Sequence, residues 1–221
     1  MEERYIRNLG ALTEAECALL RTKKVFVAGC GGLGGYITEM LLRVGVGNIA
    51  TADGDVFEAS NLNRQLLSSP ELIGVSKAEA AAKRAAFVNP EVEFHASNVF
   101  LDEGNVKTLI AGCDAVIDAL DNIASRRILA KACLELSIPF VYGAICGWTA
   151  QAGISMPGDG LIDLLYPEGA ALTSKASLSF TPPFCAAIQA ALCVKLLCGR
   201  EVQTGRLYYT DLLNMEFEAI F

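Results

Sequence analysis

The chain has 221 residues and a formal net charge of −7, with 52% apolar and 19% charged residues. This length can build a large α/β domain with a sizeable core, and the acidic balance argues against a general nucleic-acid binder. No apolar run reaches the ~18 residues of a membrane span, and the N-terminus lacks the hydrophobic segment of a signal peptide. We therefore expect a cytoplasmic protein that contacts no membrane.

Cysteine and histidine usage limits the metal and catalytic chemistry that we expect. The eight cysteines stand at positions 17, 30, 113, 133, 146, 185, 193 and 198, and no two of them form a C-x-x-C pair. The chain has one histidine, His95. A tetrahedral zinc site and a histidine-based triad are therefore both unexpected. Free thiols in a reducing compartment are the simplest interpretation.

The chain begins with a segment that we expect to be a short amphipathic arm, residues 1–22. Within it, Thr13 and Glu16 fit a capping box at the start of a helix. The apolar run at 24–28 then predicts a strand, and the patterning from about 35–44 predicts a helix.

A glycine-rich turn, GCGGLG at residues 29–34, joins this strand to this helix. Gly29 permits a tight turn, Gly31 lets the backbone approach a phosphate, and Gly34 lets the helix pack closely on its strand. The helix start offers free N–H groups to that phosphate. Asp53 ends the next apolar run about 20 residues later, which is the spacing of a ribose-binding carboxylate. The combination favours nucleotide binding over a glycine turn that serves packing alone.

Further along the chain, predicted strands alternate with predicted helices. The strands are expected at 48–52, 92–96, 115–120 and 138–142, and the helices at 77–87, 104–111, 124–136 and 184–197. This alternation predicts an α/β fold, a Rossmann-like, doubly wound, mostly parallel sheet with helices on both faces.

The pattern changes after Gly143, where glycine and proline become frequent. A terminal strand pair is expected at 207–210 and 215–220, so the elaborated C-terminal third should contain antiparallel strands. We see no repeat or low-complexity linker and expect a single domain, 1–221. Its parts are the arm, a nucleotide-binding core at 23–143 and a C-terminal part at 144–221.

A second polar segment, SNLNRQ at residues 60–65, lies just after Asp53, at the carboxyl edge of the predicted sheet. Open α/β folds bind their ligands at this edge. An arginine and two amides can gather around a polyphosphate, because guanidinium binds phosphate bidentately; a polar loop with a surface arginine is the alternative. Lys77 can add a charge from the start of the next helix.

Carboxylates close a third strand at the same edge. Asp118 lies near the end of the strand predicted at 115–120, and the pair Asp121-Asn122 follows it. Carboxylates there suit a Mg²⁺ ion that also contacts phosphate. A bare dinucleotide cofactor would need neither this metal nor a second cationic set. The sequence therefore predicts a triphosphate site.

Several motifs occur in a fixed order: RYIRN at 4–8, GCGGLG at 29–34, GVGNIATADGD at 45–55, SNLNRQ at 60–65, VNPEVE at 88–93, DALDN at 118–122 and AAIQAALCVKLLCG at 186–199. This arrangement covers most of the chain and resembles the ThiF/MoeB/HesA family, bacterial relatives of the ubiquitin-activating enzymes.

The resemblance implies ATP-dependent adenylation of the C-terminal glycine of a small ubiquitin-like sulfur-carrier protein that ends in Gly-Gly. Pyrophosphate would be released, and the reaction would belong to sulfur transfer of the molybdopterin/tungstopterin or thiamine type. The implied cofactors are ATP and Mg²⁺. The C-terminal part would bind the carrier and the second subunit of a homodimer. Neither the carrier nor the pathway can be identified from the sequence.

The resemblance also implies roles for particular residues. Arg64 and Lys77 would bind the β- and γ-phosphates, Asp121 would hold Mg²⁺, and Arg7 would reach into the site of the partner subunit; these four form the expected catalytic set. The expected nucleotide-binding residues are Gly29, Gly31, Gly32, Gly34, Asp53, Asp55, Asn61, Arg64, Gln65, Lys77 and Asn122. For Arg7 and Lys77 the alternative is a solvated surface charge.

The chain departs from the family pattern in its cysteines. Many relatives carry two C-x-x-C pairs that bind a structural zinc, so this short form is expected to bind no zinc. The loop ALTSKASLSFTPPF at 171–184, where some relatives carry a reactive cysteine, has none. Cys185 follows at the expected helix start, where a thiol pKa can be lowered, but core packing is the favoured role. We therefore expect adenylation without a covalent intermediate, and a separate protein as sulfur donor.

Other function classes remain open at this stage. A NAD-dependent oxidoreductase would share the glycine turn and Asp53, but it would leave SNLNRQ and Asp121 unexplained. A non-catalytic binding platform for a ubiquitin-like partner would have no chemical need for Arg64, Lys77 and Asp121. Adenylation of a small molecule or of a tRNA base precursor is a further possibility, which the acidic charge weakens for tRNA.

Overall fold

The computed structural model describes residues 3–167, 169–170, 174 and 176–220. Its strands form an eight-stranded sheet in the order β3-β2-β1-β4-β5-β6-β7-β8. Their bounds are β1 (Lys24–Ala28), β2 (Asn48–Ala52), β3 (Glu93–Ser97), β4 (Ala115–Asp118), β5 (Phe140–Cys146), β6 (Thr149–Ser155), β7 (Leu207–Asp211) and β8 (Glu216–Ile220). The pairings from β3 to β5 are parallel, and those from β5 to β8 are antiparallel. The predicted α/β class, with antiparallel strands in the C-terminal third, is confirmed.

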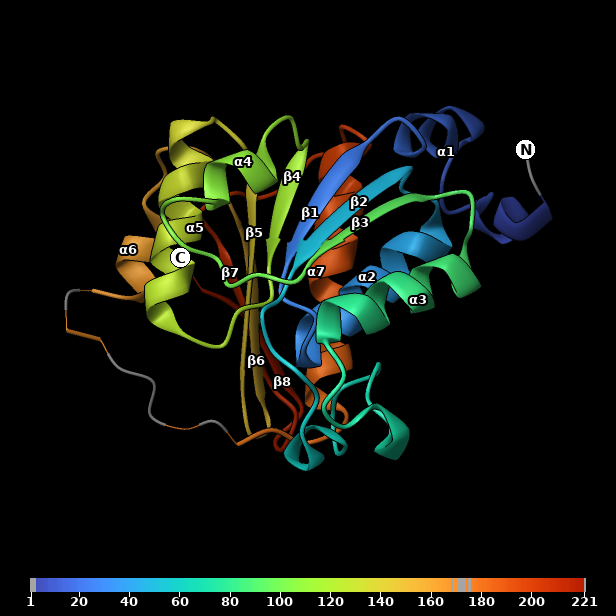
Figure 1. The fold of residues 1–221 in the computed structure, drawn as a ribbon. Coiled ribbons are helices and arrows are strands. Elements are labelled where there is room, and N and C mark those ends of the chain that lie inside the picture. The colour runs from blue at the N-terminus through green and yellow to red at the C-terminus, as the bar shows by residue number, and fades with distance from the viewer. Residues whose placement is uncertain (1–2, 168, 171–173, 175, 221) are drawn as a thin grey trace.

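Helices cover both faces of the sheet (Figure 1). One face carries α2 (Gly32–Val44), α3 (Lys77–Val88) and α7 (Thr181–Leu197). The other carries α4 (Val106–Ile110), α5 (Ile123–Glu135) and α6 (Leu161–Leu165). The chain also forms α1 (Glu14–Leu20) and the 3-10 turns η1 (Glu3–Asn8), η2 (Ala59–Asn61) and η3 (Pro70–Leu72).

Strand β1 shows why the central strands are apolar on both sides. Val25 and Val27 pack into the core below α2 and α7, whereas Phe26 and Ala28 pack into the core below α4 and α5. All four side chains have no exposed surface. A parallel strand that is covered on both faces needs a continuous apolar run rather than an alternating one, and the sequence at 24–28 provides it.

The N-terminal arm is tied to the rest of the chain by polar contacts. Thr13 and Glu16 form the predicted capping box at the start of α1. Arg200, which follows α7, donates to the carboxylate of Glu16 at 2.5 and 2.8 Å.

Among the described residues, no helix is both long enough and apolar enough to cross a membrane.

The sequence-based expectations were incomplete after Gly143. Strand β6 was not predicted, because TAQAGIS has small side chains and no apolar alternation. It forms a strand because β5 and β7 pair with it on both sides. The five-residue helix α6 was also missed. Helix α2 begins at Gly32 rather than near residue 35.

Candidate active site

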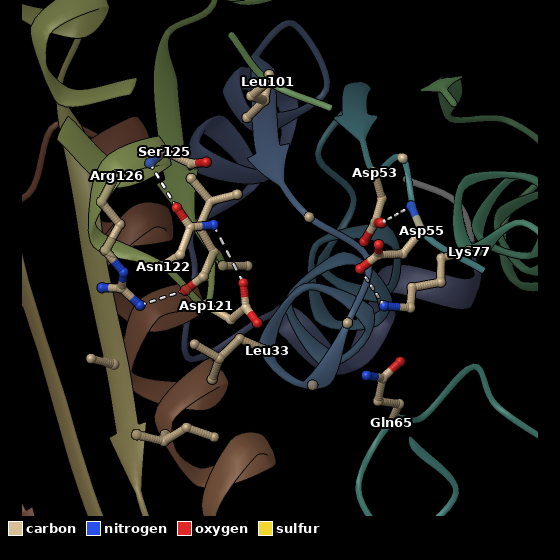
Figure 2. Close-up of a pocket in the computed structure, with 18 of the residues that line it drawn as sticks. Leu33, Asp53, Asp55, Gln65, Lys77, Leu101, Asp121, Asn122, Ser125 and Arg126 are labelled. Atoms are coloured by element: carbon tan, nitrogen blue, oxygen red, sulfur yellow. Dashed lines mark hydrogen bonds and ion pairs between the residues drawn. The ribbon is translucent and has the colours of Figure 1, made fainter. Parts of the chain in front are cut away.

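A pocket of about 240 Å³ opens at the carboxyl ends of the parallel strands. The loops that follow β1, β2, β3 and β4 line it, together with the end of β5. Figure 2 shows Asp53, Asp55 and Lys77 on one side and Asp121, Asn122 and Arg126 on the other. The predicted residues that line it are Gly29, Gly31, Gly32, Asp53, Asp55, Arg64, Gln65, Lys77, Asp121 and Asn122.

The glycine loop has a backbone that other residues could not adopt. Gly29 has φ +103°, and a Cβ there would lie 3.0 Å from the carbonyl oxygen of Ala119. A Cβ on Gly34 would lie 1.8 Å from the carbonyl oxygen of Gly29, so only glycine allows α2 to pack this closely on the turn. Gly34 does not line the pocket; it shapes the loop from behind. The start of α2 therefore faces the pocket with free N–H groups.

Asp53, which follows β2, and Lys77, the first residue of α3, both face the pocket. The two carboxylate oxygens of Asp53 accept the N–H groups of Cys30 at 2.7 Å and Asp55 at 2.9 Å. Burial raises the pKa of Asp53, although these two N–H groups and Lys77 oppose the effect. The Lys77 ammonium pairs with the Asp55 carboxylate at 3.0 Å, while only 9% of the Lys77 side chain is exposed. A nearly buried ammonium with one exposed partner is well placed to bind an anion.

The SNLNRQ segment presents Arg64 and Gln65 to the pocket. Arg64 donates from Nη1 to the carbonyl of Ser60 at 2.8 Å and to Oδ1 of Asn63 at 2.9 Å. Gln65 is buried, and its Oε1 has no hydrogen-bond partner among the described residues. Such a buried acceptor requires a donor from a ligand or water.

Asn61 was expected to bind nucleotide, but it does not line the pocket. Its side chain Oδ1 accepts the N–H of Glu58 at 3.1 Å. Its backbone carbonyl accepts the N–H groups of Arg64 at 3.1 Å and Gln65 at 3.0 Å. Asn61 therefore stabilises the turn that presents these two side chains.

Asp121 and Asn122 form the opposite wall of the pocket. Asp121 is exposed, and its Oδ1 accepts a hydrogen bond from Asn122 at 3.5 Å. Asn122 also caps α5 by accepting the N–H of Ser125 at 2.9 Å. Among the described residues, no group of three or more His, Cys, Asp or Glu side chains is arranged to hold a metal ion.

Asp118 does not join these residues, contrary to expectation. It has no exposed surface and pairs with Arg126 at 2.9 Å. Burial raises the pKa of Asp118 to about 6, against the opposing effects of Arg126 and the Leu120 N–H. A carboxylate that is enclosed in this way cannot reach a metal in the pocket. The pattern of the sequence did not distinguish Asp118 from Asp121, because the two differ in burial.

An apolar wall on the Asp53 side was missed by the sequence analysis. Val99, Phe100 and Leu101 line the pocket from the loop after β3. A Cβ on Gly54 would lie 2.6 Å from the Phe100 ring, so this glycine lets the ring lie against the backbone. The apolar run VFL after a predicted strand was the available signal.

Two other residues from the sequence analysis, Arg7 and Cys185, lie outside the lining of this pocket. Arg7 lies exposed on η1 and does not line the pocket of its own chain. Cys185 lies within α7, is fully buried, and burial raises the pKa of its thiol to about 12. It therefore packs in the core, as the sequence analysis favoured. Cys146 is the exposed cysteine of the chain.

The sequence matches the model of the ThiF family over residues 4–220. The chain belongs to the ThiF family. It is 35% identical over 208 residues to the SAMP-activating enzyme E1 of Haloferax volcanii, covering 91% of this chain and 77% of that protein. It is 30% identical over 210 residues to the molybdopterin-synthase adenylyltransferase of Escherichia coli, covering 91% of this chain and 84% of that protein.

Solved structures agree with this family assignment at the level of the fold. The crystal structure of E. coli MccB with ATP superposes with a TM-score of 0.85 at 21% identity, covering 100% of this chain and 71% of that one. The family match and the named adenylyltransferases together make this chain an adenylyltransferase of the ThiF/MoeB type.

Proposed function

We propose that this chain uses ATP to adenylate the C-terminal glycine of a small ubiquitin-like sulfur-carrier protein, with release of pyrophosphate. The observation that carries the proposal is the pocket at the carboxyl edge of the sheet. There the glycine loop, the cationic side chains of Arg64 and Lys77 and the carboxylate of Asp121 line one cavity. The names of the relatives support this class of substrate.

The nucleotide would lie across the pocket in an order set by the chemistry of its walls. The apolar side chains of Val99, Phe100 and Leu101 would pack against the adenine, and Asp53 would accept a ribose hydroxyl. The triphosphate would then pass the N–H groups at the start of α2, within reach of Arg64 and Lys77.

The residues present also fit a magnesium ion. Mg²⁺ takes one or two protein carboxylates together with phosphate oxygens and water, and Asp121 is an exposed carboxylate in the pocket. Asp121 would hold the ion, which when bound neutralises charge on the phosphates. This requirement is smaller than that of an all-protein metal cage, so one carboxylate such as Asp121 is enough.

The chemical step needs no general base. The carboxylate of the carrier is already an anion; it attacks the α-phosphorus, and the bond to the pyrophosphate oxygen breaks. The task of the protein is to align two anions and to stabilise the charge that develops on the leaving group. Lys77 and Arg64 would supply that stabilisation. The NAD-dependent alternative leaves these two cations and Asp121 without a role.

The C-terminal part, 144–221, would provide the surfaces for the carrier and for the second subunit of a homodimer. Several large apolar side chains are exposed in this part; they are Trp148, Leu164, Phe180, Leu213, Met215 and Phe217. Arg7 would complete the site of the partner subunit. Sulfur would come from a separate donor protein, in a pathway of the molybdopterin/tungstopterin or thiamine type.

The test is ATP–pyrophosphate exchange with purified protein and Mg²⁺. Exchange is expected only with a ubiquitin-like carrier that ends in Gly-Gly, and a carrier shortened by its last glycine is the matched control. Exchange that ignores the carrier, or that occurs with a small carboxylic acid alone, would contradict the proposed substrate. ATP binding without exchange for any carrier would favour the binding platform.

The shared site has its own test in mixed dimers. Arg7→Ala and Arg64→Ala subunits should each be inactive alone. Random mixing should restore about a quarter of wild-type activity, because half the dimers are hybrids with one intact site each. Absence of rescue in dimers shown to be hybrid would contradict a role for Arg7 in the partner's site.

A further inference from the structure

A buried ion pair lies beside Asp121, and its arginine, Arg126, lines the pocket on the same side. Asp118 at the end of β4 pairs with Arg126 of α5 at 2.9 Å, and 5% of the Arg126 side chain is exposed. Removing two charges from water is costly unless both are well paired and hydrogen-bonded. The proposed adenylation step does not use this ion pair directly. Its cost in desolvation therefore indicates a different role.

The pair holds both backbone hydrogen-bonding groups of one residue, Leu120. Asp118 accepts the N–H of Leu120 at 3.0 Å through Oδ1, and Arg126 donates from Nη2 to the carbonyl of Leu120 at 2.5 Å. Both hydrogen-bonding groups of the residue before Asp121 are therefore fixed by the same two buried charges. Figure 2 shows the Arg126 side chain directed at this backbone beside Asp121.

The guanidinium is itself held on its other side. Its carbon lies 5.3 Å from the ring centre of Tyr142 and 5.7 Å from that of Tyr166, and Nη1 donates to the Tyr166 hydroxyl at 3.4 Å. The two tyrosine hydroxyls are 2.8 Å apart. A planar fork with several donors can pair with the Asp118 carboxylate while it donates to a carbonyl and a hydroxyl.

We propose that Arg126 is a positioning residue, which fixes the peptide before Asp121 and thereby sets the affinity of the site for Mg²⁺ with ATP. This inference rests on the proposed function. Groups that orient a metal-binding side chain typically change metal affinity when they are replaced, by about 10- to 100-fold. Arg126 itself lines the pocket, and the inference assigns its effect to the hydrogen bond with the Leu120 carbonyl and not to contact with the metal.

The informative variant is Arg126→Lys. A lysine keeps a positive charge for Asp118, but its single ammonium cannot also reach the Leu120 carbonyl and the Tyr166 hydroxyl. The matched control is Arg127→Lys, because Arg127 is the adjacent arginine on α5 and its Nη2 donates to the carbonyls of Tyr166 and Pro167 instead. Thermal unfolding of both variants checks that the fold is retained.

The measurement is calorimetric binding of a non-hydrolysable ATP analogue at a series of Mg²⁺ concentrations. For Arg126→Lys, the Mg²⁺ concentration that gives half of the maximal effect should rise about tenfold. Affinity measured without Mg²⁺ should be unchanged, and Arg127→Lys should behave as the wild type. A purely structural role would weaken binding equally with and without Mg²⁺.

Two results would overturn the inference: a wild-type Mg²⁺ dependence in Arg126→Lys, or an equal change in Arg127→Lys. If Arg126→Lys does not fold, the double variant Asp118→Asn with Arg126→Gln removes both charges together and should show the same shift. Wild-type protein that fails to bind the analogue at any Mg²⁺ concentration would overturn the proposed function itself, which separates the two failures.

Discussion

The parallel and antiparallel parts of the sheet differ in what they contribute to the molecule. Strands β1 to β5 run parallel, and the loops after β1, β2 and β4 bring the glycine turn, Asp53 and Asp121 to one pocket. Strands β6 to β8 run antiparallel and contribute buried packing, with Phe217 of β8 exposed. Parallel strands end at the same edge of a sheet, whereas antiparallel neighbours end at opposite edges.

Gln189 shows how the second part supports the first. It is a fully buried polar residue of α7, and its Nε2 donates to the carbonyl of Asp118 at 2.7 Å. A Cβ on Gly143 of β5 would lie 2.1 Å from its amide carbon, so this glycine leaves room for the amide. The candidate catalytic residues lie at one edge of the sheet, and the remaining elements hold that edge in place.

The largest effect is expected from Asp121→Ala. This variant tests whether the residues at the carboxyl edge of the parallel strands are needed for adenylation. Loss of the carboxylate should lower carrier-dependent ATP–pyrophosphate exchange by about 10³-fold or more, because charge on the leaving group is no longer balanced. Thermal unfolding should change little, since Asp121 is exposed. Asp163→Ala, at an exposed aspartate of α6, is the control. Near-normal exchange in Asp121→Ala would contradict the metal role.

Lys77→Met should lower exchange by about 100-fold, because it removes one cation from the triphosphate while keeping the buried aliphatic stem. The effect should be seen in affinity for ATP as well as in turnover. Lys83→Met lies on the same helix at an exposed position and should behave as the wild type. Equal losses in the two variants would point to helix α3 and not to the phosphate contact.

Labelling of Cys185 tests whether helix α7 provides a reactive thiol for covalent attachment of the carrier. Because its thiol is buried and its pKa is raised to about 12, we expect no alkylation in the folded protein and full alkylation after unfolding. Cys146, which is exposed, should be labelled first. Mass spectrometry after timed alkylation resolves the two. A carrier adduct that disappears in Cys185→Ala would overturn the expectation of adenylation without a covalent intermediate.

The smallest effect concerns the contact of the N-terminal arm with the end of α7. Hydrogen bonds from Arg200 first, and then from the Thr13 backbone and hydroxyl, lower the pKa of Glu16 from 4.5 to about 2. The folded pKa lies below the unfolded one, so this stabilisation is present above about pH 4.5 and is lost as the pH falls toward 2. Urea unfolding of wild type and Arg200→Gln should therefore differ at pH 7 and converge near pH 2. A difference that persists at low pH would assign the effect to packing.

Much of the pocket could be predicted because local patterns specify it. The apolar run of β1, the glycines that follow it and Asp53 each have a requirement that only a few residue types meet. Three features could not be predicted in this way. They are the burial of Asp118, the position of Asn61 outside the pocket lining, and the positioning role that we propose for Arg126. Each depends on which neighbouring element covers the side chain.

The sequence by itself determined the parallel β-α order, the glycine turn and the set of polar residues after the strands, because periodicity and backbone freedom are local properties. The tertiary structure decided which carboxylate faces the pocket. Asp118 and Asp121 are three residues apart, and Arg126 covers the first and leaves the second exposed. The tertiary structure also decided that β6 is a strand. Its small residues have weak strand preference, but β5 and β7 pair with it on both sides. Burial and long-range pairing are properties of the folded chain, so no local pattern carries them.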